Sequence, residues 1–191
     1  MKVGSQRGSQ SGITIIETMF AAFILIVGSL AMVGLIFRSI ALNNRNKLES
    51  TQTMLSTSIA EQINSTIIGS GQSSLVDCAG TTHTIDTQPG VGANLNGEDI
   101  DFDENIAADA TKNNYHMDYL LRTPCNSTGK LQGLYDVRWR VDKIGRGTPP
   151  SDTDTQSFML TIGSALKGRS KGNLFFAKPV TIRVMSGNEQ R

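Results

Sequence analysis

One long apolar run dominates the pattern of hydrophobic and polar positions along the chain. Residues 13–37 contain a single ionisable side chain, that of Glu17, and about 20 apolar residues are enough to span a bilayer as a helix. The run therefore predicts a transmembrane helix. A carboxylate at the centre of such a helix costs about 2.5–3.5 kcal/mol, and ionisable residues in membrane helices usually face a partner and mark function. Glu17 is accordingly a candidate functional residue.

A second, amphipathic half of the same helix is predicted for residues 38–68. No proline or glycine interrupts this segment, and apolar residues recur in it at helical spacing. Glycine and serine at 69–71 supply a stop signal. The apolar stripe is expected to pack on a sheet of the same chain, and a coiled coil is the alternative. Its members are Leu48, Leu55, Ile59, Ile63 and Ile67.

Three segments of the C-terminal part alternate apolar and polar residues, as half-buried strands do. They lie at residues 135–142, 158–162 and 180–184. Connectors with Gly, Pro and Ser favour an antiparallel meander with one solvated face, whose apolar face the helix stripe would cover. The predicted fold class is α+β, a long N-terminal helix packed on a C-terminal antiparallel sheet. The side chains expected to face the core are Tyr135, Val137, Trp139, Val141, Phe158, Leu160, Ile162, Val180, Ile182 and Val184.

Between the predicted helix and sheet, residues 69–129 are rich in Gly, Ser, Thr, Asn and Asp. Their periodicity is weak, so we expect mostly loop, with residues 119–121 as the strongest strand candidate. Residues 71–129 carry nine acidic and two basic side chains, whereas residues 130–191 carry eleven basic and five acidic ones. The net charge of +1 therefore hides an acidic half and a basic half.

Residues suited to enzymatic chemistry are scarce. His83 and His116 lie in polar segments without metal-ligand spacing, and no phosphate-binding glycine loop is present. The sequence therefore predicts no enzyme, no cofactor and no metal site. Residues 99–104 place carboxylates as positions one, three and five of an EF-hand loop do, but Glu104 and Ala110 stand where that loop needs glycine and glutamate. A solvated acidic loop is expected there, and calcium binding through another loop geometry is the alternative.

The flanks of the apolar run have the features of a processing signal. Lys2 and Arg7 precede the run and orient its N-terminus toward the cytoplasm. The small residue of an ordinary secretory cleavage site follows the apolar region, whereas Gly12 comes before it. Cleavage after Gly12 would remove residues 1–12 as a leader and keep the helix.

The prepilin motif of type IV pilins and pseudopilins is similar to the run Gly12-Ile13-Thr14-Ile15-Ile16-Glu17 of this chain. The resemblance implies cleavage by a prepilin peptidase after Gly12, N-methylation of Ile13, and a role for Glu17 in subunit assembly. The family usually has phenylalanine at the first mature position, so Ile13 departs from its pattern. The resemblance also implies a single-pass inner-membrane protein with a periplasmic head that later enters a cell-surface pilus. An uncleaved signal anchor is the alternative.

Two further segments narrow the resemblance. Residues 21–35, with Gly28 and Gly34, resemble the helix of PilV-type minor pilins, and residues 135–139 resemble the tryptophan-containing strand of that group. Residues 69–129 carry no such resemblance. Each glycine costs about 1 kcal/mol of helix propensity relative to alanine, and it lets the helix bend or neighbouring helices approach.

This narrower resemblance implies a minor pilin that acts in pilus biogenesis or in initiation at the pilus tip. Its partners would be other pilin subunits, contacted through the N-terminal helix, and the prepilin peptidase. A pseudopilin of a type II secretion system is the alternative, because it shares the same motif and differs only in the machine that it joins.

The two cysteines, Cys78 and Cys125, lie on the side of the membrane helix that is expected to face the periplasm. Disulfides persist in such an oxidising compartment. A bridge between the two would stabilise the acidic segment by about 4 kcal/mol in the loop-entropy model. Two free thiols are the alternative.

The basic half raises a second class of function, the capture of DNA. Clustered cations would supply the salt-dependent attraction to phosphates on which such binding depends. Because Arg138 and Arg140 alternate with core residues, however, they are expected on the solvated sheet face, and DNA capture is the weaker hypothesis. The basic residues concerned are Arg138, Arg140, Lys143, Arg146, Lys167, Arg169, Lys171 and Lys178.

Overall fold

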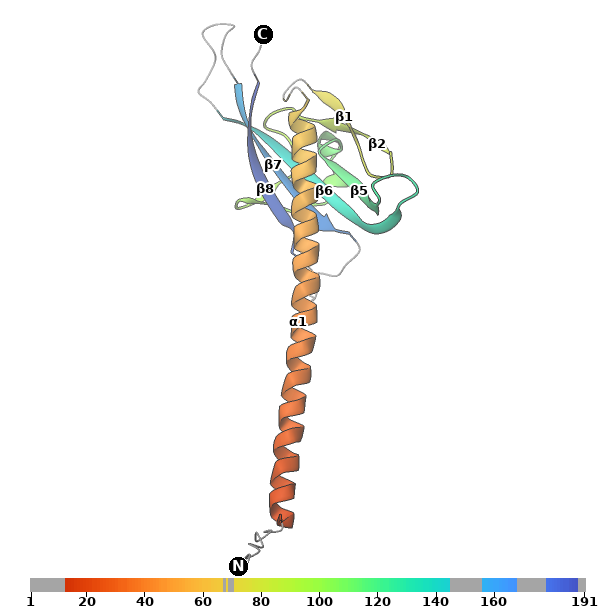
Figure 1. Ribbon diagram of the computed structural model, residues 1–191. Coiled ribbons are helices and arrows are strands. Elements are labelled where there is room, and N and C mark those ends of the chain that lie inside the picture. Colours follow the sequence, from red (N-terminus) through yellow and green to blue (C-terminus); the bar gives the residue numbers. More distant parts are fainter. Residues whose placement is uncertain (1–12, 67, 69–70, 145–155, 168–177, 189–191) are drawn as a thin grey trace, which may run out of the picture. The chain divides into compact units, whose positions relative to one another are not determined.

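A computed structural model (Figure 1) describes residues 13–66, 68, 71–144, 156–167 and 178–188. The fold class is α+β, as predicted: one long helix, α1, precedes a set of antiparallel strands. The chain divides into two compact units, one up to Asn43 and one from Asn44 onward. Each unit is described by itself below.

Helix α1 covers Ile15–Asn64 and so joins the two predicted halves. It ends earlier than residue 68, although Ser65 N–H still donates to Glu61 O (2.9 Å) and Thr66 N–H donates to Ile63 O (3.0 Å). The predicted stop at 69–71 lies outside the described residues except for Gly71, whose φ is 100°. The leader 1–12 and the Ile67 side chain also lie outside them.

The main sheet has four strands, not the three predicted. These strands are β5 (His116–Thr123), β6 (Lys130–Ile144), β7 (Gln156–Leu166) and β8 (Val180–Asn188). They pair in the order β5-β6-β7-β8, and every pair is antiparallel. The expected meander is therefore confirmed, and the strand predicted at 119–121 belongs to β5, a longer edge strand.

The apolar stripe of α1 packs on this sheet, within the second unit. Leu55, Ile59 and Ile63 share one core cluster with the inward-facing residues of β6 and β7, and Leu48 is half-buried. The stripe is therefore buried inside the chain, and the alternative of a coiled coil is wrong for it. The core residues of the sheet strands that are at most 2% exposed are Tyr135, Val137, Trp139, Val141, Phe158, Leu160 and Ile162.

Buried polar groups fix the register of α1 on the sheet. Ser56 Oγ donates to Ser164 Oγ (2.9 Å), which in turn donates to Gln52 O (3.1 Å). The Gln52 amide, in the orientation that satisfies both of its groups, donates to Lys178 O (2.8 Å) and accepts from Leu166 N–H (3.2 Å). A later helix residue thus meets an earlier residue of β7, so this part of α1 runs antiparallel to β7 and parallel to β8.

The face of the sheet away from α1 was expected to be solvated, and this expectation is wrong for its central part. A second cluster of Ala93, Ile100 and Ile106 lies there. It is built by β3 (Leu95–Asn96), β4 (Asp99–Ile100) and the 3-10 helix η1 (Ile106–Ala108), which precedes η2 (Ala110–Lys112). A Cβ on Gly163 would come within 2.8 Å of Ile100 Cβ, so β4 packs directly on β7 where that strand has no side chain.

The segment 69–129 also holds more regular structure than the predicted loop. The hairpin of β1 (Gln72–Val76) and β2 (Thr82–Asp86) contributes Leu75 and Ile85 to the main core. Gly92 then pairs with Arg140, next to β6. A Cβ on Gly92 would lie 2.6 Å from Trp139 O, and its φ of 132° favours glycine as well. This close approach requires a residue without a side chain.

Candidate functional site

The most unusual surface of the described chain is the apolar part of α1 in the first unit. Every large apolar side chain from Ile13 to Leu42 is between 47% and 82% exposed. Soluble monomers rarely expose contiguous apolar patches beyond a few hundred Å². We refer to residues 13–42 as the exposed apolar segment. Something outside the chain has to cover this segment.

Two hydroxyl side chains of the exposed apolar segment bond back to the helix backbone. Ser29 Oγ donates to Leu25 O (2.6 Å), and Thr18 Oγ1 donates to Ile15 O (2.7 Å). These hydroxyls are satisfied by the helix itself, as lipid or a tightly packed helix bundle requires. By length and composition, α1 can cross a membrane, and it is the one such helix in the described part of the chain.

Gly28 and Gly34 lie within the exposed apolar segment, and α1 continues through both. A Cβ on either would meet no atom within 4 Å, so no contact within the described chain requires glycine there. Small residues at such positions allow close approach of a second helix. The glycines could let the helix bend or let another helix approach. The absence of a contact within the described chain favours the approach of another helix.

Glu17 carries the only charge of the exposed apolar segment between Ile13 and Phe37. It lies in the first turn of α1, where its own N–H donates to Thr14 O (3.1 Å). The helix dipole stabilises a negative charge in a first turn. Among the described residues, no cation pairs with the Glu17 carboxylate. Ile13 lies just ahead of the helix and is 73% exposed, whereas Gly12 lies outside the described residues.

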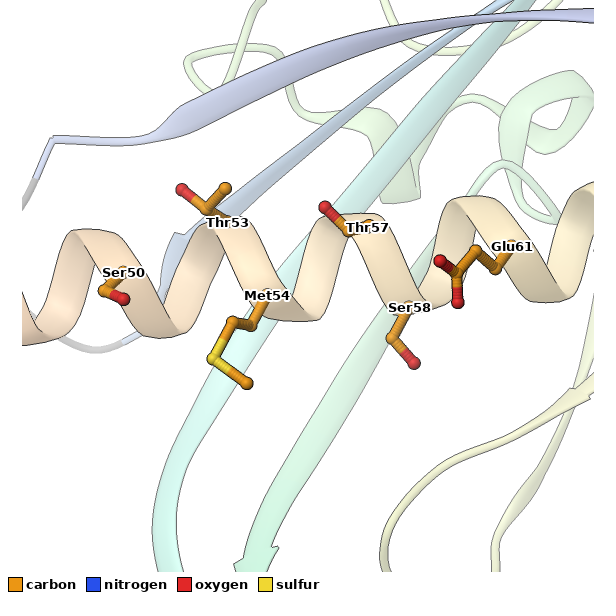
Figure 2. Close-up of a pocket in the computed structure, with 6 residues that line it drawn as sticks. All are labelled: Ser50, Thr53, Met54, Thr57, Ser58 and Glu61. Carbon is orange, nitrogen blue, oxygen red and sulfur yellow. The ribbon is translucent and has the colours of Figure 1, made fainter.

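The outer face of α1 in the second unit offers no chemistry of its own. Figure 2 shows the side chains that line a pocket on it, four short hydroxyl side chains together with Met54 and Glu61. Several hydroxyls of this part of the helix bond back to its backbone, as Thr53 Oγ1 does to Glu49 O (2.9 Å). One carboxylate among hydroxyls provides neither a nucleophile with a base nor a set of metal ligands. The residues of this face are Ser50, Thr53, Met54, Thr57, Ser58 and Glu61.

Cys78 and Cys125 form a disulfide, so the alternative of two free thiols is wrong. The bond joins the turn after β1 to the loop after β5, and the Tyr119 hydroxyl donates to Cys78 Sγ (3.4 Å). The bond closes the acidic segment as predicted, and it also joins two elements of the fold. The disulfide fastens the β1–β2 hairpin to the edge of the main sheet.

Asp77 organises the turn that carries Cys78. Its Oδ1 accepts from Ala79 N–H (2.9 Å) and Thr81 N–H (2.8 Å), and its Oδ2 lies 3.3 Å from His83 Nε2. Burial alone would raise the pKa of this carboxyl, but the hydrogen bonds and the nearby imidazole outweigh burial and lower its pKa. The charged Asp77 carboxylate therefore has a structural role in this turn.

The second histidine, His116, begins β5 and is half-buried. Burial lowers its pKa, and its Nε2 has no hydrogen-bond partner among the described residues. The two histidines therefore lie in different environments: His83 is next to Asp77, and His116 is half-buried at the start of β5. In the described residues, no three His, Cys, Asp or Glu side chains come together in a way that could hold a metal ion.

The carboxylates at residues 99–104 do not converge on a common point. Asp101 Oδ1 accepts from Asp103 N–H (2.8 Å), and Glu104 Oε2 accepts from Asn94 N–H (2.8 Å) while Oε1 pairs with Lys112. The Lys112 ammonium also donates to Asn94 Oδ1 (2.9 Å). Asp101 and Glu104 therefore hold this segment together, whereas Asp99 and Asp103 are exposed.

Several of the described basic residues of the C-terminal half are paired with aspartates and so do not form one free cationic surface. Arg138 pairs with Asp136 (2.8 Å), Arg140 with Asp142 (2.8 Å) and Lys167 with Asp118 (2.6 Å). Lys143 and Lys178 are exposed. Arg146, Arg169 and Lys171 lie outside the described residues. Neutralised cations contribute little to the phosphate attraction that DNA binding needs.

The alternation pattern correctly places Arg138 on the sheet face away from α1, but it predicts an exposed side chain where the structure has a buried one. It is only 7% exposed, donates to Asp101 O (3.0 Å) and Glu104 O (2.9 Å), and its guanidinium lies 5.2 Å from the Phe102 ring centroid. In the sequence, only the apolar residues at 100, 102 and 106 indicate that this segment has a core of its own. Their spacing matches no regular element.

Comparison of the chain with protein-family models, with curated proteins and with solved structures found no match in any of the three. What the structure itself provides is a pilin-like architecture, in which a long apolar N-terminal helix precedes a disulfide-bonded antiparallel sheet that packs on its second half.

Proposed function

We propose that this chain is a minor pilin, which a prepilin peptidase cleaves after Gly12 and which then assembles into a type IV pilus. It acts in pilus biogenesis or in initiation at the tip. It performs no catalysis and needs no cofactor. Before assembly, the exposed apolar segment anchors it in the inner membrane, with its head in the periplasm, where the Cys78–Cys125 disulfide is stable.

The observation that carries this proposal is the exposure of apolar side chains along the whole segment from Ile13 to Leu42. A lipid bilayer covers such a helix before assembly, and the equivalent helices of neighbouring subunits cover it afterwards. Gly28 and Gly34 leave room for those helices, because a Cβ on either would meet no atom of the described chain within 4 Å. The resemblance of residues 12–17 to the prepilin motif supports the same reading.

Glu17 gives the assembly step its specificity in this proposal. Cleavage after Gly12 creates an α-amino group on Ile13, and such groups have a pKa near 8, so most are cationic at neutral pH. Glu17 has no cation partner among the described residues of its own chain. The new amino group of one subunit pairs with the Glu17 carboxylate of another, because an unpaired charge in a low-dielectric filament core is costly.

Two other functions fit the chain less well. A pseudopilin of a type II secretion system uses the same helix and the same carboxylate, so the choice between the machines rests on the resemblance of residues 21–35 to PilV-type pilins. Capture of DNA is disfavoured because Arg138, Arg140 and Lys167 are each paired with an aspartate.

The test is assembly of a Glu17→Gln variant in cells that carry a prepilin peptidase and a major pilin. We expect its amount in sheared filaments to fall by about tenfold or more, because losing one partner of a buried charge pair costs 2–5 kcal/mol. Glu49→Gln is the matched control, since Glu49 is a helical carboxylate outside the exposed apolar segment and pairs with Arg45 one helical turn before it. Equal amounts of both variants in filaments would contradict the proposal, provided that both reach the membrane.

A further inference from the structure

The two cysteines of the disulfide have different surroundings. Cys78 belongs to the main core cluster and is 5% exposed. Cys125 lies in the loop after β5, where residues 123–128 are all exposed. The bond therefore joins a buried cysteine to one at the surface of the second unit.

Access to the disulfide favours a reaction at Cys125. A thiolate that breaks a disulfide attacks one sulfur along the extension of the S–S bond and expels the other. Attack on Cys125 Sγ comes from the side of the exposed loop. Attack on Cys78 Sγ would have to come through the core around Cys78, where this sulfur also accepts a hydrogen bond from the Tyr119 hydroxyl. Access therefore selects Cys125 as the sulfur that is attacked.

Charge selects the same sulfur, because the attacking thiolate is an anion. The loop at residues 123–129 carries no acidic side chain, and the exposed Lys130 follows it. Cys78, in contrast, directly follows Asp77, whose carboxylate is charged and 6% exposed. An approaching anion is therefore repelled more strongly at Cys78 than at Cys125.

The sulfur expelled by such an attack is that of Cys78, and a donor already lies beside it. The Tyr119 hydroxyl donates to Cys78 Sγ (3.4 Å), and a hydrogen bond to a charged acceptor is about twice as strong as one to a neutral acceptor. Burial and the nearby Asp77 charge raise the pKa of Tyr119, so its hydroxyl keeps its proton at neutral pH. Because Asp77 opposes a second negative charge here, the thiolate of Cys78 depends on this donor.

We propose that the Cys78–Cys125 disulfide exchanges with a dithiol protein, that the exchange takes place at Cys125, and that Tyr119 stabilises the thiolate of Cys78. In the reducing direction, the thiolate of the partner bonds to Cys125 Sγ, the Cys78–Cys125 bond breaks, and Cys78 leaves as a thiolate that takes up a proton from water. A second thiolate of the partner then displaces Cys125. Two electrons pass from the partner to the chain.

In the oxidising direction, the same steps run backwards. The Cys125 thiolate attacks the disulfide of the partner and forms a mixed disulfide, while one sulfur of the partner leaves as a thiolate. The Cys78 thiolate then attacks Cys125 Sγ and releases the partner as a dithiol. Cys125 is thus the cysteine that contacts the partner, and Cys78 is the one that resolves the mixed disulfide. That the chain meets such a partner in the periplasm rests on the proposed function.

The experiment uses the full, oxidised chain in detergent micelles at neutral pH. The probe is a thioredoxin-type protein in which serine replaces the second cysteine of its Cys-X-X-Cys motif, so that the mixed disulfide persists. The reaction is stopped early with acid, and mass spectrometry of peptides shows which cysteine carries the probe. We expect at least about tenfold more probe on Cys125 than on Cys78. In urea that unfolds the chain, the two cysteines should carry about equal amounts, because access no longer differs.

A variant of Tyr119 tests the donor. Tyr119→Phe should slow the initial rate of exchange about fivefold, because one hydrogen bond to the expelled sulfur is lost. A merely structural effect would loosen the surroundings of the disulfide and would speed up the exchange instead. Tyr115→Phe is the matched control and should leave the rate unchanged, since the Tyr115 hydroxyl donates to Gln88 O (3.2 Å). Fluorescence of Trp139, the only tryptophan, reports whether each variant is folded.

Three outcomes would overturn the proposal. They are equal or greater labelling of Cys78 in the folded chain, a rate that Tyr119→Phe leaves unchanged or raises, and no reaction of the folded chain while the unfolded chain reacts to completion. The readout does not depend on cleavage after Gly12 or on Glu17. Its failure is thus distinguishable from failure of the proposed function.

Discussion

At the residue scale, Arg138 shows what alternation along a strand can and cannot reveal. The pattern of residues 135–142 places it correctly on the face away from the helix. It cannot show that residues 93–106 fold over that face, so the sequence predicted a solvated cation where the structure has a buried one. A buried guanidinium needs several acceptors, and Asp136, Asp101 O and Glu104 O supply them.

This difference predicts unequal effects for two similar changes. Arg138→Met should lower the free energy of unfolding by about 3 kcal/mol, because it leaves Asp136 and two carbonyls without their donor. Arg140→Met should cost less than about 1 kcal/mol, since the Arg140–Asp142 pair is more exposed. Urea unfolding of the full chain in micelles, followed by Trp139 fluorescence, measures both. Equal losses would show that the second cluster does not bury Arg138.

Asp77 predicts a pH dependence of stability. Its pKa in the folded chain lies below its ordinary value, since its hydrogen bonds and His83 outweigh the effect of burial. A lowered pKa stabilises the folded state above the unfolded pKa of about 3.9, and the stabilisation is lost as pH falls through the folded pKa.

The measurement is the free energy of unfolding of wild type and Asp77→Asn from pH 7 down to pH 2. The wild type should be the more stable above about pH 5, and the difference should shrink below about pH 4. A difference that stays constant over this range would mean that the Asp77 charge does not stabilise the turn.

At the element scale, periodicity predicted the long elements and missed the short ones. The stripe from Leu48 to Ile63 and the alternation in β6, β7 and β8 are regular over many residues, so the sequence was sufficient for them. Strands β3 and β4 have two residues each, and two residues carry no period. The β1–β2 hairpin is polar except for a few residues such as Leu75 and Ile85, which only the folded core explains.

The disulfide belongs to this scale because it joins two elements. Cys78 and Cys125 are separated by 47 residues, and for such a loop the entropy model gives about 4 kcal/mol of stabilisation. The double variant Cys78→Ser, Cys125→Ser should lose about that amount in the same urea measurement. Hydrogen exchange should speed up most in β1, β2 and β5, because the bond fastens that hairpin to that strand. Uniform acceleration over the whole sheet would contradict this local role.

At the scale of the whole molecule, the chain combines a unit that buries its apolar residues with one that exposes them. The second unit has a closed core of helix and sheet, whereas Ile13 to Leu42 are exposed along the first. The sequence predicted the apolar run and its single carboxylate, since both are local features. It could not predict that Glu17 has no cation partner within the described chain, because that depends on where every other charge folds.

The central claim is that this exposed helix is released from a leader and covered by other subunits. Mass spectrometry of the N-terminal peptide from the membrane-extracted chain, with and without a co-expressed prepilin peptidase, tests it most directly. We predict a peptide that begins at Ile13 and carries one added methyl group, and that appears only with the peptidase. Retention of residues 1–12 under both conditions would contradict the claim and would leave a signal-anchored head without an assembly role for Glu17.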